Sequence, residues 1–210
     1  MSELDPDSAE TSRLLDEVRS RDETAFDQLF ARHRRGLRQF VAHRLDPRVQ
    51  ARLDPSDIVQ ETQLEVYRRM DDFLRRQPMP FRLWLRKTAY ERLLKLRRFH
   101  VDAARRSVGR ELGLSDQSSL LLARPFLSRE SSPSQQLTRA ELIRRVRQAL
   151  AELSGVDRDV LLMRNVDELP YREIGCILDL DPAAARKRYG RALLRLRGLL
   201  LDAGLLEDHP

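Results

Sequence analysis

Several residue types are scarce in this chain of 210 residues, and each scarcity excludes a class of protein. The single cysteine, Cys176, excludes an internal disulfide and a cysteine-cluster zinc site. No apolar stretch approaches the ~18–20 residues that a membrane-spanning helix needs. The N-terminal sequence MSELDPDSAE is acidic and polar, and it lacks the apolar core of a signal peptide. We therefore expect a cytoplasmic protein without membrane insertion.

Motifs that would indicate catalysis are also missing. The four histidines are scattered without metal-ligand spacing, and the sequence has no Gly-rich phosphate loop, nucleophile elbow or paired-carboxylate site. The acidic residues of Asp54–Glu61 superficially resemble a metal site, but they lie along one helix flank and no second acidic cluster accompanies them. We expect no enzymatic activity, no cofactor and no metal, with a metal-dependent nuclease as a distant alternative.

The pattern of apolar residues predicts an all-α fold. Glycine and proline are sparse, with 8 and 10 residues, and no segment alternates cleanly in the manner of a β-strand. Apolar residues recur instead at helical spacing in three stripes within the first half of the chain. These stripes are Phe26, Leu29, Phe30, Leu37, Phe40, Val41 and Leu45; Ile58, Val59, Thr62, Leu64, Val66, Tyr67, Met70, Phe73 and Leu74; and Leu83, Trp84, Leu85, Ala89, Tyr90, Leu93, Leu94 and Leu96.

Capping and breaking residues delimit these predicted helices. Asp22 is suited to cap the first helix and Pro47 to end it. The second predicted helix starts with the sequence Asp54-Pro55-Ser56-Asp57. Asp54 provides an N-cap carboxylate, Pro55 occupies the first helical position, and Asp57 at the third position makes the segment close to a capping box. The breaker Gln77-Pro78-Met79-Pro80 separates the second helix from the third.

A change of composition after about residue 100 predicts two domains. Residues 101–136 lose the helical periodicity and contain eight serines and two prolines. The helical pattern resumes at Leu137. We predict two small helical domains, over residues 8–100 and 137–203, joined by a flexible linker over residues 101–136 with a short helix near Ser119–Ala123.

The basic residues are almost all arginine, with only three lysines among 39 basic side chains and a net charge of +6. Arginine binds phosphate in a bidentate manner, which favours a nucleic-acid partner, although the codon bias of a GC-rich genome explains the preference equally well. Ten basic and two acidic side chains lie within Arg82–Arg110, interleaved with aromatic residues. This pattern suits single-stranded nucleic acid. The alternative is a solvated helix face over a core that buries Trp84 and Phe99.

The C-terminal part contains a helix-turn-helix pattern. A short helix over Pro170–Leu178 is followed by the tight turn Asp179–Asp181. Asp181-Pro182 then provides an N-cap and a proline at the first position of a second helix, which extends to about Leu200. Since the turn has no glycine, we expect Asp179 to adopt a left-handed conformation, which aspartate tolerates.

Helical geometry divides the second of these helices into an apolar back and a basic front. The back consists of Ala185, Tyr189, Ala192, Leu193 and Leu196, and the front of Ala183, Ala184, Arg186, Lys187 and Arg191. Small residues near the start leave room for the helix to enter a DNA major groove, where basic side chains reach base edges or phosphates. Arg188 lies nearer the core edge, where a structural role is expected. The alternative is an ordinary solvated amphipathic helix.

Three segments together resemble one family, the bacterial RNA polymerase sigma factors. Asp54–Thr62 is similar to the start of the core-binding helix, region 2.2, and Phe81–Leu85 with Arg86–Arg98 is similar to the promoter-melting regions 2.3–2.4. Leu153–Arg197 resembles region 4. Two domains with no third between them resemble the extracytoplasmic-function (ECF) group.

This resemblance implies the roles of particular residues. Asp57, Gln60 and Glu61 would dock on the β′ clamp helices of core polymerase, unless Asp57 only caps its helix and Glu61 is only solvated. The loop Arg75–Arg82 would capture a flipped base of the −10 element. The residues near the melted strand would be Arg82, Trp84, Arg86, Lys87 and Lys95. Glu91 departs from the family, because an asparagine is common there and a carboxylate repels phosphate.

The resemblance also implies the overall function. The protein would direct core RNA polymerase to specific promoters, and its C-terminal helix would read the −35 element through Ala183, Ala184, Arg186, Lys187 and Arg191. Its partners would be core polymerase (β′ clamp helices and β flap) and promoter DNA, and the resemblance allows an anti-sigma factor. A helix-turn-helix regulator that acts without polymerase is the main alternative, and an adaptor that docks on polymerase is another.

Overall fold

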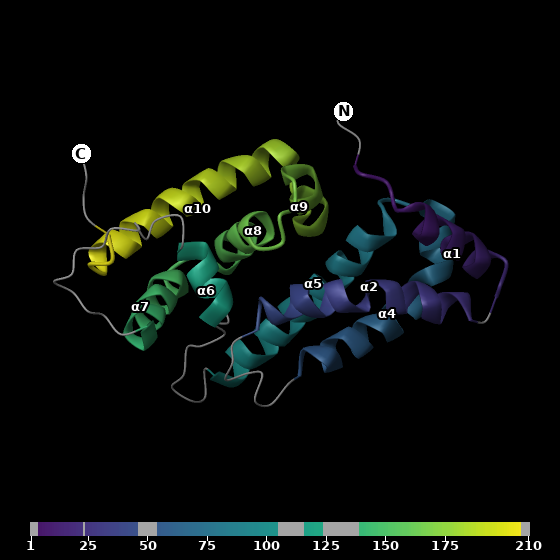
Figure 1. Cartoon of the computed structure of the whole chain (residues 1–210), viewed down its shortest axis with the longest axis horizontal. Coiled ribbons are helices and arrows are strands. Elements are labelled where there is room, and N and C mark those ends of the chain that lie inside the picture. The colour runs from purple at the N-terminus through teal and green to yellow at the C-terminus, as the bar shows by residue number, and fades with distance from the viewer. Residues whose placement is uncertain (1–3, 23, 46–53, 105–115, 124–138, 207–210) are drawn as a thin grey trace. The chain divides into compact units, whose positions relative to one another are not determined.

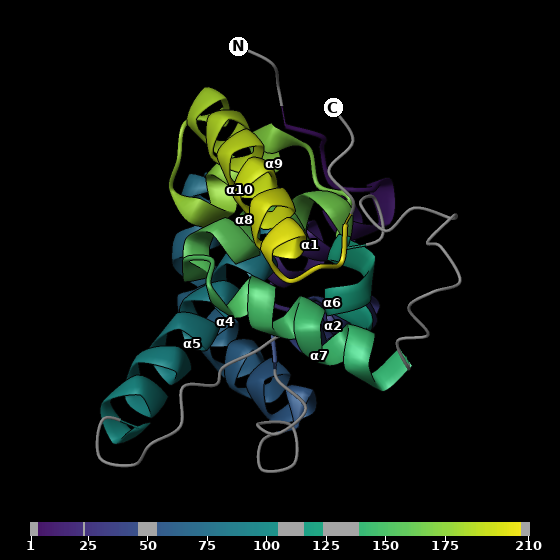
Figure 2. The same cartoon turned by 90° about the vertical axis from the view of Figure 1, so that its left-hand side faces the viewer.

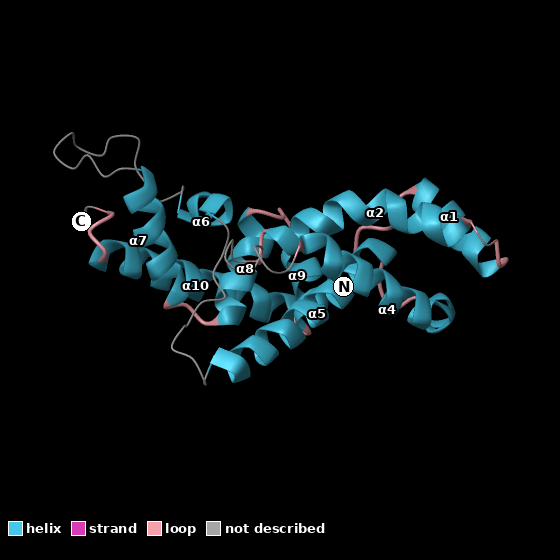
Figure 3. Ribbon diagram, turned by 90° about the horizontal axis from the view of Figure 1, so that it is seen from below, coloured by secondary structure: helices cyan, strands magenta, loops and turns pink. Residues whose placement is uncertain are grey.

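The computed structural model describes residues 4–22, 24–45, 54–104, 116–123 and 139–206. Regular structure in these ranges is helical throughout, with no strand among them (Figure 3), which confirms the predicted all-α class. Backbone contacts divide the chain into two compact units. Unit 1 comprises residues 1–42, 50–110 and 176–179, and unit 2 comprises residues 43–49, 111–175 and 180–210.

Unit 1 is built from four described helices, α1 (Ala9–Arg19), α2 (Ala25–Ala42), α4 (Pro55–Arg76) and α5 (Phe81–Ala104). Helix α2 packs against each of the other three, and α4 also packs along α5 (Figure 1). All seven residues of the first predicted stripe are buried; six of them lie in α2, and Leu45 lies beyond the end of α2 in the segment that belongs to unit 2. The proline expected to end this helix lies outside the described residues.

Aromatic rings join α4 to the start of α5. Trp84 stacks on Phe73, with ring centroids 4.3 Å apart, and Phe81 meets Phe73 edge-on at 5.6 Å. Such pairs add to the stabilisation that apolar burial already provides. Gln77, in a left-handed conformation with φ of 37°, ends α4 where the breaker sequence predicts a boundary.

Two members of the second predicted stripe are not in the core, and the prediction was wrong for them. Leu64 is 58% exposed and Tyr67 is 66% exposed. They follow Asp57 and Gln60 by seven residues, which is close to two full turns of an α-helix. Leu64 and Tyr67 therefore lie on the exposed side of α4, with Asp57 and Gln60.

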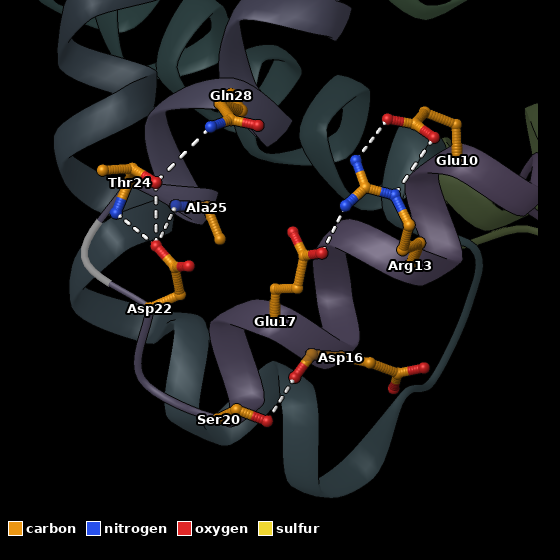
Figure 4. Close-up of polar contacts among 9 residues, drawn as sticks. All are labelled: Glu10, Arg13, Asp16, Glu17, Ser20, Asp22, Thr24, Ala25 and Gln28. Atoms are coloured by element: carbon orange, nitrogen blue, oxygen red, sulfur yellow. Dashed lines mark hydrogen bonds and ion pairs between the residues drawn. The ribbon is translucent and has the colours of Figure 1, made fainter.

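The predicted N-caps are present in unit 1. One carboxylate oxygen of Asp22 accepts hydrogen bonds from the backbone N–H groups of Thr24, at 2.8 Å, and Ala25, at 3.2 Å (Figure 4). Asp54 caps α4 and accepts from the N–H of Ser56 at 2.6 Å, while its own N–H donates to Asp57 at 3.2 Å. These bonds satisfy N–H groups that have no partner within their helices.

Unit 2 contains α6 (Asp116–Ala123), α7 (Arg139–Ala151), α8 (Gly155–Asn165), α10 (Pro182–Asp202) and, as far as Gly175, α9 (Tyr171–Leu178). Helix α10 packs on α7 and α8, and α6 packs on the same two helices (Figure 2). The buried core of unit 2 includes Leu122, Ala123, Val146, Ala149, Leu150, Leu153, Leu161, Leu162, Ala192, Leu196 and Leu200.

The expected linker is only partly described. Helix α5 continues to Ala104, and residues 105–115 and 124–138 lie outside the described ranges. The short helix expected near Ser119–Ala123 is observed as α6, and it buries Leu122 and Ala123 in the core of unit 2. This burial accounts for part of the leucine-rich patch in the linker sequence. The domain boundaries and the flexibility of the linker stay predictions.

Candidate DNA and polymerase interfaces

The turn between α9 and α10 is held by backbone geometry. Asp179 has a φ of 55°, which confirms the expected left-handed conformation, and the Leu180 N–H donates to the Gly175 carbonyl at 2.9 Å. This bond closes the end of α9 in the pattern of a Schellman cap. A Cβ atom at Gly175 would lie 2.5 Å from the Leu180 carbonyl oxygen, so only glycine fits there without a shift of the backbone.

The start of α10 follows the cap that the sequence predicts. The Asp181 carboxylate accepts a hydrogen bond from the Ala183 N–H at 2.8 Å, and Pro182 occupies the first turn. Proline fits there because the first N–H groups of a helix have no partner within the helix. The cap thus fixes where α10 begins and where its small residues lie.

The back of α10 is fixed to both ends of α8. Ala185, Ala192 and Leu196 are buried, as the wheel predicts. Arg188 Nη1 donates to Asp157 Oδ1 at 2.9 Å in the first turn of α8. The Tyr189 hydroxyl donates to Asn165 Oδ1 at 3.0 Å, at the other end of α8. Arg188 thus takes the structural part expected for its position, and the two contacts set the orientation of α10 within unit 2.

The front of α10 is open to solvent. The five residues predicted to contact −35 DNA, Ala183, Ala184, Arg186, Lys187 and Arg191, are all exposed. Leu194 is 71% exposed on the same side, seven residues after Lys187 and three after Arg191. Sequence reasoning assigned Leu194 no role, although the same wheel arithmetic would have placed it on the front.

The predicted polymerase-binding residues form one face of α4. Asp57, Gln60 and Glu61 are exposed, and Leu64 extends the same face by one turn. Asp57 both caps the helix and remains accessible, so the two interpretations of this residue are compatible. Glu61 accepts a hydrogen bond from Arg92 of α5 in an ion pair, which orients its carboxylate.

The predicted −10 residues do not share one surface of α5. Trp84 is only 5% exposed and stacked on Phe73, which agrees with the core interpretation of its ring. Arg82 and Arg86 lie one turn apart and line a common cavity of about 120 Å³. Lys95 is exposed but follows Arg86 by nine residues, so it points to the opposite side of the helix. Lys87 is partly buried.

The carboxylate of Glu91 has a cationic neighbour. Arg69 Nη1 lies 3.4 Å from Glu91 Oε2, and the Arg69 guanidinium also lies 5.8 Å from the centre of the Trp84 ring. The ion pair offsets part of the negative charge that would otherwise repel a DNA phosphate. The side chains of Arg69 and Glu91 are 44% and 41% exposed, so solvent weakens this pair.

A second cavity lies beside the loop between α4 and α5. It measures about 430 Å³, and Gln77, Met79 and Pro80 of the loop line it together with residues of α1. Asp7 also lines it, and its carboxylate accepts from the N–H groups of Phe81, at 2.6 Å, and Arg82, at 3.3 Å. Sequence reasoning missed Asp7, because only tertiary structure brings it to a helix that begins more than seventy residues later.

Comparisons with known proteins agree with this geometry. Residues 143–196 match the family model described as Sigma-70, region 4. The chain is 29% identical over 197 residues to RNA polymerase sigma factor CnrH of Cupriavidus metallidurans, covering 94% of this chain and 97% of that protein. It is 28% identical over 180 residues to RNA polymerase sigma factor NccH of Alcaligenes xylosoxydans xylosoxydans, covering 85% of this chain and 88% of that protein.

Solved structures share the fold. CnrH in complex with the cytosolic domain of CnrY matches with a TM-score of 0.59 and 24% identity, over 93% of this chain and 99% of that one. The sigma factor RpoE in complex with the anti-sigma factor NepR from Bartonella quintana matches with a TM-score of 0.56 and 18% identity, over 85% of this chain and 98% of that one. The chain is therefore similar over most of its length to RNA polymerase sigma factors, and its helix-turn-helix of α9 and α10 lies within the segment that matches region 4 of the sigma-70 family.

Proposed function

We propose that the protein is an ECF-type sigma factor that directs core RNA polymerase to specific promoters and initiates transcription there. The observation that carries this proposal is the basic, exposed front of α10. It lies on a correctly capped helix-turn-helix, inside the segment that matches region 4 of the sigma-70 family. A helix of this kind reads duplex DNA in the major groove.

The face of α4 is the proposed contact with the β′ clamp helices of core polymerase. Asp57, Gln60 and Glu61 offer carboxylate and amide oxygens to a basic partner surface. Leu64, which is 58% exposed beside them, supplies an apolar anchor of the kind found at the centre of protein interfaces. We add Leu64 to the set for this reason.

The front of α10 is the proposed contact with the −35 element. Arg186, Lys187 and Arg191 are placed to reach base edges or phosphates, and Ala183 and Ala184 allow close approach at the start of the helix. Arg195 and Arg197, also exposed, are suited to the flanking backbone. The β flap of polymerase is a further proposed partner of unit 2.

The −10 element is assigned to unit 1, where we propose that Arg82, Arg86, Lys87 and Lys95 contact the melted strand. Trp84 then acts as a positioning residue, because its buried ring packs the start of α5 against α4. The cavity beside Gln77, Met79 and Pro80 is the proposed place for a flipped base. A base outside the stack needs a pocket that receives it.

An anti-sigma factor is a proposed regulator, since CnrH and RpoE are both seen in complexes, RpoE with an anti-sigma factor. The proposed place of action is the bacterial cytoplasm, where core polymerase and promoters are found. We assign the chain no bond-making step. Within the described residues, no helix has the length and apolar character needed to cross a membrane, and no group of three His, Cys, Asp or Glu residues is placed to hold a metal ion.

In vitro transcription tests the proposal. Purified chain is added to core polymerase with a library of genomic fragments, and the 5′ ends of the transcripts are mapped. The expected result is a set of start sites that share upstream elements and depend on the added chain. Core polymerase alone is the control. Tight binding to a palindromic duplex without polymerase, combined with no chain-dependent start sites, would establish the regulator alternative instead.

A further inference from the structure

The start of α5 has no capping side chain directly before it. The helix begins at Phe81, and the preceding residue is Pro80, whose ring offers no oxygen to accept a hydrogen bond. The N–H groups of Leu83 and Trp84 donate to the Pro80 carbonyl, at 3.0 and 3.1 Å. The N–H groups of Phe81 and Arg82 come before them and need acceptors from outside the helix.

Asp7 supplies these acceptors from the N-terminal segment. Its Oδ2 accepts a hydrogen bond from the Phe81 N–H at 2.6 Å, and its Oδ1 accepts from the Arg82 N–H at 3.3 Å. A negative charge at this end of a helix is also favoured by the helix dipole. The Arg82 side chain donates in turn to the Asp5 backbone carbonyl at 3.0 Å, so the same segment contacts the first turn of α5 twice.

The residue that follows Asp7 anchors the segment at its other side. Ser8 is the N-cap of α1, and its Oγ accepts a hydrogen bond from the Thr11 N–H at 3.3 Å. Two consecutive residues thus cap two different helices, Asp7 the start of α5 and Ser8 the start of α1. Since α1 itself packs on α2 and α4, the first turn of α5 is tied to the rest of unit 1.

This cap lies at the cavity that we propose for the flipped base. Asp7 lines the cavity of about 430 Å³ together with Pro80 and other residues of the loop between α4 and α5. The loop is fixed at one end by the left-handed Gln77, which closes α4. At the other end Pro80 is bonded directly to Phe81, whose N–H is held by the Asp7 carboxylate. Loss of that carboxylate would release this second end and change the wall of the cavity.

We propose that Asp7 is a positioning residue for recognition of the −10 element, because its cap on α5 holds the loop in the conformation that receives the flipped base. The inference rests on the proposed sigma-factor function and adds to it a residue of the N-terminal segment. Asp7 acts through the backbone of Phe81 and Arg82 and needs no contact with DNA. The opposite role, in which this segment blocks the start of α5 until DNA displaces it, is an outcome of the test.

The test uses the chain assembled with core polymerase and a promoter fragment that is pre-melted at the mapped −10 region. Bases of the non-template strand are replaced one at a time by abasic sites, and the dissociation constant of each complex is measured. One abasic site should weaken the wild-type complex several-fold, because the missing base is the one that enters the cavity. Asp7→Ala should weaken the complex with the intact strand several-fold, and the same abasic site should then have little further effect.

Asp22→Ala is the matched control. Asp22 caps α2 in the same unit and accepts from two backbone N–H groups, at 2.8 and 3.2 Å (Figure 4). This variant loses the same charge and the same kind of cap, and urea unfolding of both variants measures the stability that each loses. Asp22→Ala should keep the wild-type response to abasic sites. If both variants lose that response equally, Asp7 acts only through the stability of unit 1 and the proposal is overturned.

Asp7→Asn provides a rescue. Asparagine keeps a side-chain carbonyl oxygen and is about as good an N-cap as aspartate, so the variant removes the charge and retains an acceptor. It should recover most of the affinity for the intact strand and most of the penalty at the one abasic site. If Asp7→Asn behaved like Asp7→Ala, the hydrogen-bonded cap would not be the cause and the proposal would fail.

Core binding separates this role from a general defect, and Asp7→Ala should bind core polymerase as the wild type does, since the α4 face is untouched. A tighter promoter complex in Asp7→Ala would show that the segment blocks the start of α5 and would overturn the proposal. If chain-dependent start sites are found but no abasic site distinguishes Asp7→Ala from wild type, the positioning role fails while the sigma-factor function stands. If no such start sites are found, the function itself fails.

Discussion

Helices α4 and α10 begin in the same way and present opposite charges. Each opens with Asp-Pro, and each cap has extended backbone, with φ and ψ of −69° and 139° at Asp54 and −62° and 142° at Asp181. Each cap carboxylate accepts a hydrogen bond from the backbone N–H two residues later, which is Ser56 at 2.6 Å in α4 and Ala183 at 2.8 Å in α10. Yet α4 exposes Asp57 and Glu61, whereas α10 exposes basic residues.

The start of a helix and the partner that the helix binds are therefore determined by different residues. The cap decides where a helix begins, because backbone N–H groups need partners whatever follows. The exposed face decides what the helix binds, because its charge must complement the partner. We infer that the α4 face serves a basic protein surface and the α10 front serves DNA, and each prediction below tests one side of this division.

Reversal of charge on the α10 front should have the largest effect. Lys187→Glu with Arg191→Glu replaces attraction to DNA by repulsion, and a loss of about 2–6 kcal/mol is expected if two contacts of ~1–3 kcal/mol add. Promoter-specific transcripts should disappear from run-off assays. Core polymerase should still co-purify with this variant, since α4 is untouched. A loss of core binding as well would contradict the division of labour between the two faces.

Reversal of charge on α4 should have the converse result. Asp57→Lys with Glu61→Lys is expected to cost about 1.5 kcal/mol or more in core binding, by analogy with close charge pairs at interfaces. The measurement is a titration of labelled chain with core polymerase. Asp16→Lys with Asp27→Lys is the matched control, because it makes the same charge change on exposed residues of α1 and α2. Equal affinity of the two double variants would remove the assignment of the α4 face.

A milder change to α10 distinguishes base reading from phosphate contact. Arg191→Ala should cost about 1–3 kcal/mol, and the loss should be confined to one position of the −35 element if the side chain reads a base. The assay compares all single-base variants of that element in competition. Arg195→Ala is the control and should weaken every variant equally. A uniform loss for Arg191→Ala would make it a phosphate contact instead.

Local sequence was sufficient to predict α2, α4, α5, α6, α9 and α10, with the caps at Asp22, Asp54 and Asp181 and the turn at Asp179, but α1, α7 and α8 were not predicted as separate helices. Asp54, Asp181 and Asp179 behave as expected because capping and left-handed turns depend on a few neighbouring residues. The helical wheel was also sufficient to predict the buried and exposed sides of α10, because α7 and α8 pack against one side of this helix. For α4 only the recurrence of apolar residues was used, and Leu64 and Tyr67 were counted in the apolar stripe although their phase matches the exposed side.

Tertiary structure was needed wherever a feature joins distant parts of one unit. Asp7 at the start of α5 and Arg32 beside Arg82 come together only when α1, α2 and α5 pack. Trp84 was placed both near DNA and partly in the core, and its burial against Phe73 depends on the packing of α4 on α5. No spacing within a single segment encodes these meetings, so pattern reasoning could not find them.

Removal of the α10 cap should have a smaller effect than any change to the faces. Asp181→Ala leaves the Ala183 N–H without its side-chain acceptor and should cost about 1 kcal/mol of stability. Urea unfolding measures the loss, and faster hydrogen exchange in the first turn of α10 locates it. Asp181→Asn keeps an acceptor and should recover most of the stability. If Asp181→Ala matched wild type in both measurements, the cap would be dispensable.

The corresponding cap of α4 should show its effect through pH. Hydrogen bonds from Ser56 lower the pKa of the Asp54 carboxyl below its ordinary value of 3.8, because they stabilise the charged form. The carboxylate therefore contributes stability above pH 3.8, and this contribution is lost as the pH falls through the lower pKa of the folded state. Asp54→Ala should lower the melting temperature near neutral pH. The difference in melting temperature between this variant and the wild type should become smaller in acid. A difference that stays constant from neutral pH to acid would mean that the Asp54 side chain acts through its shape alone, and the likeness between the two Asp-Pro caps would then end at their backbone geometry.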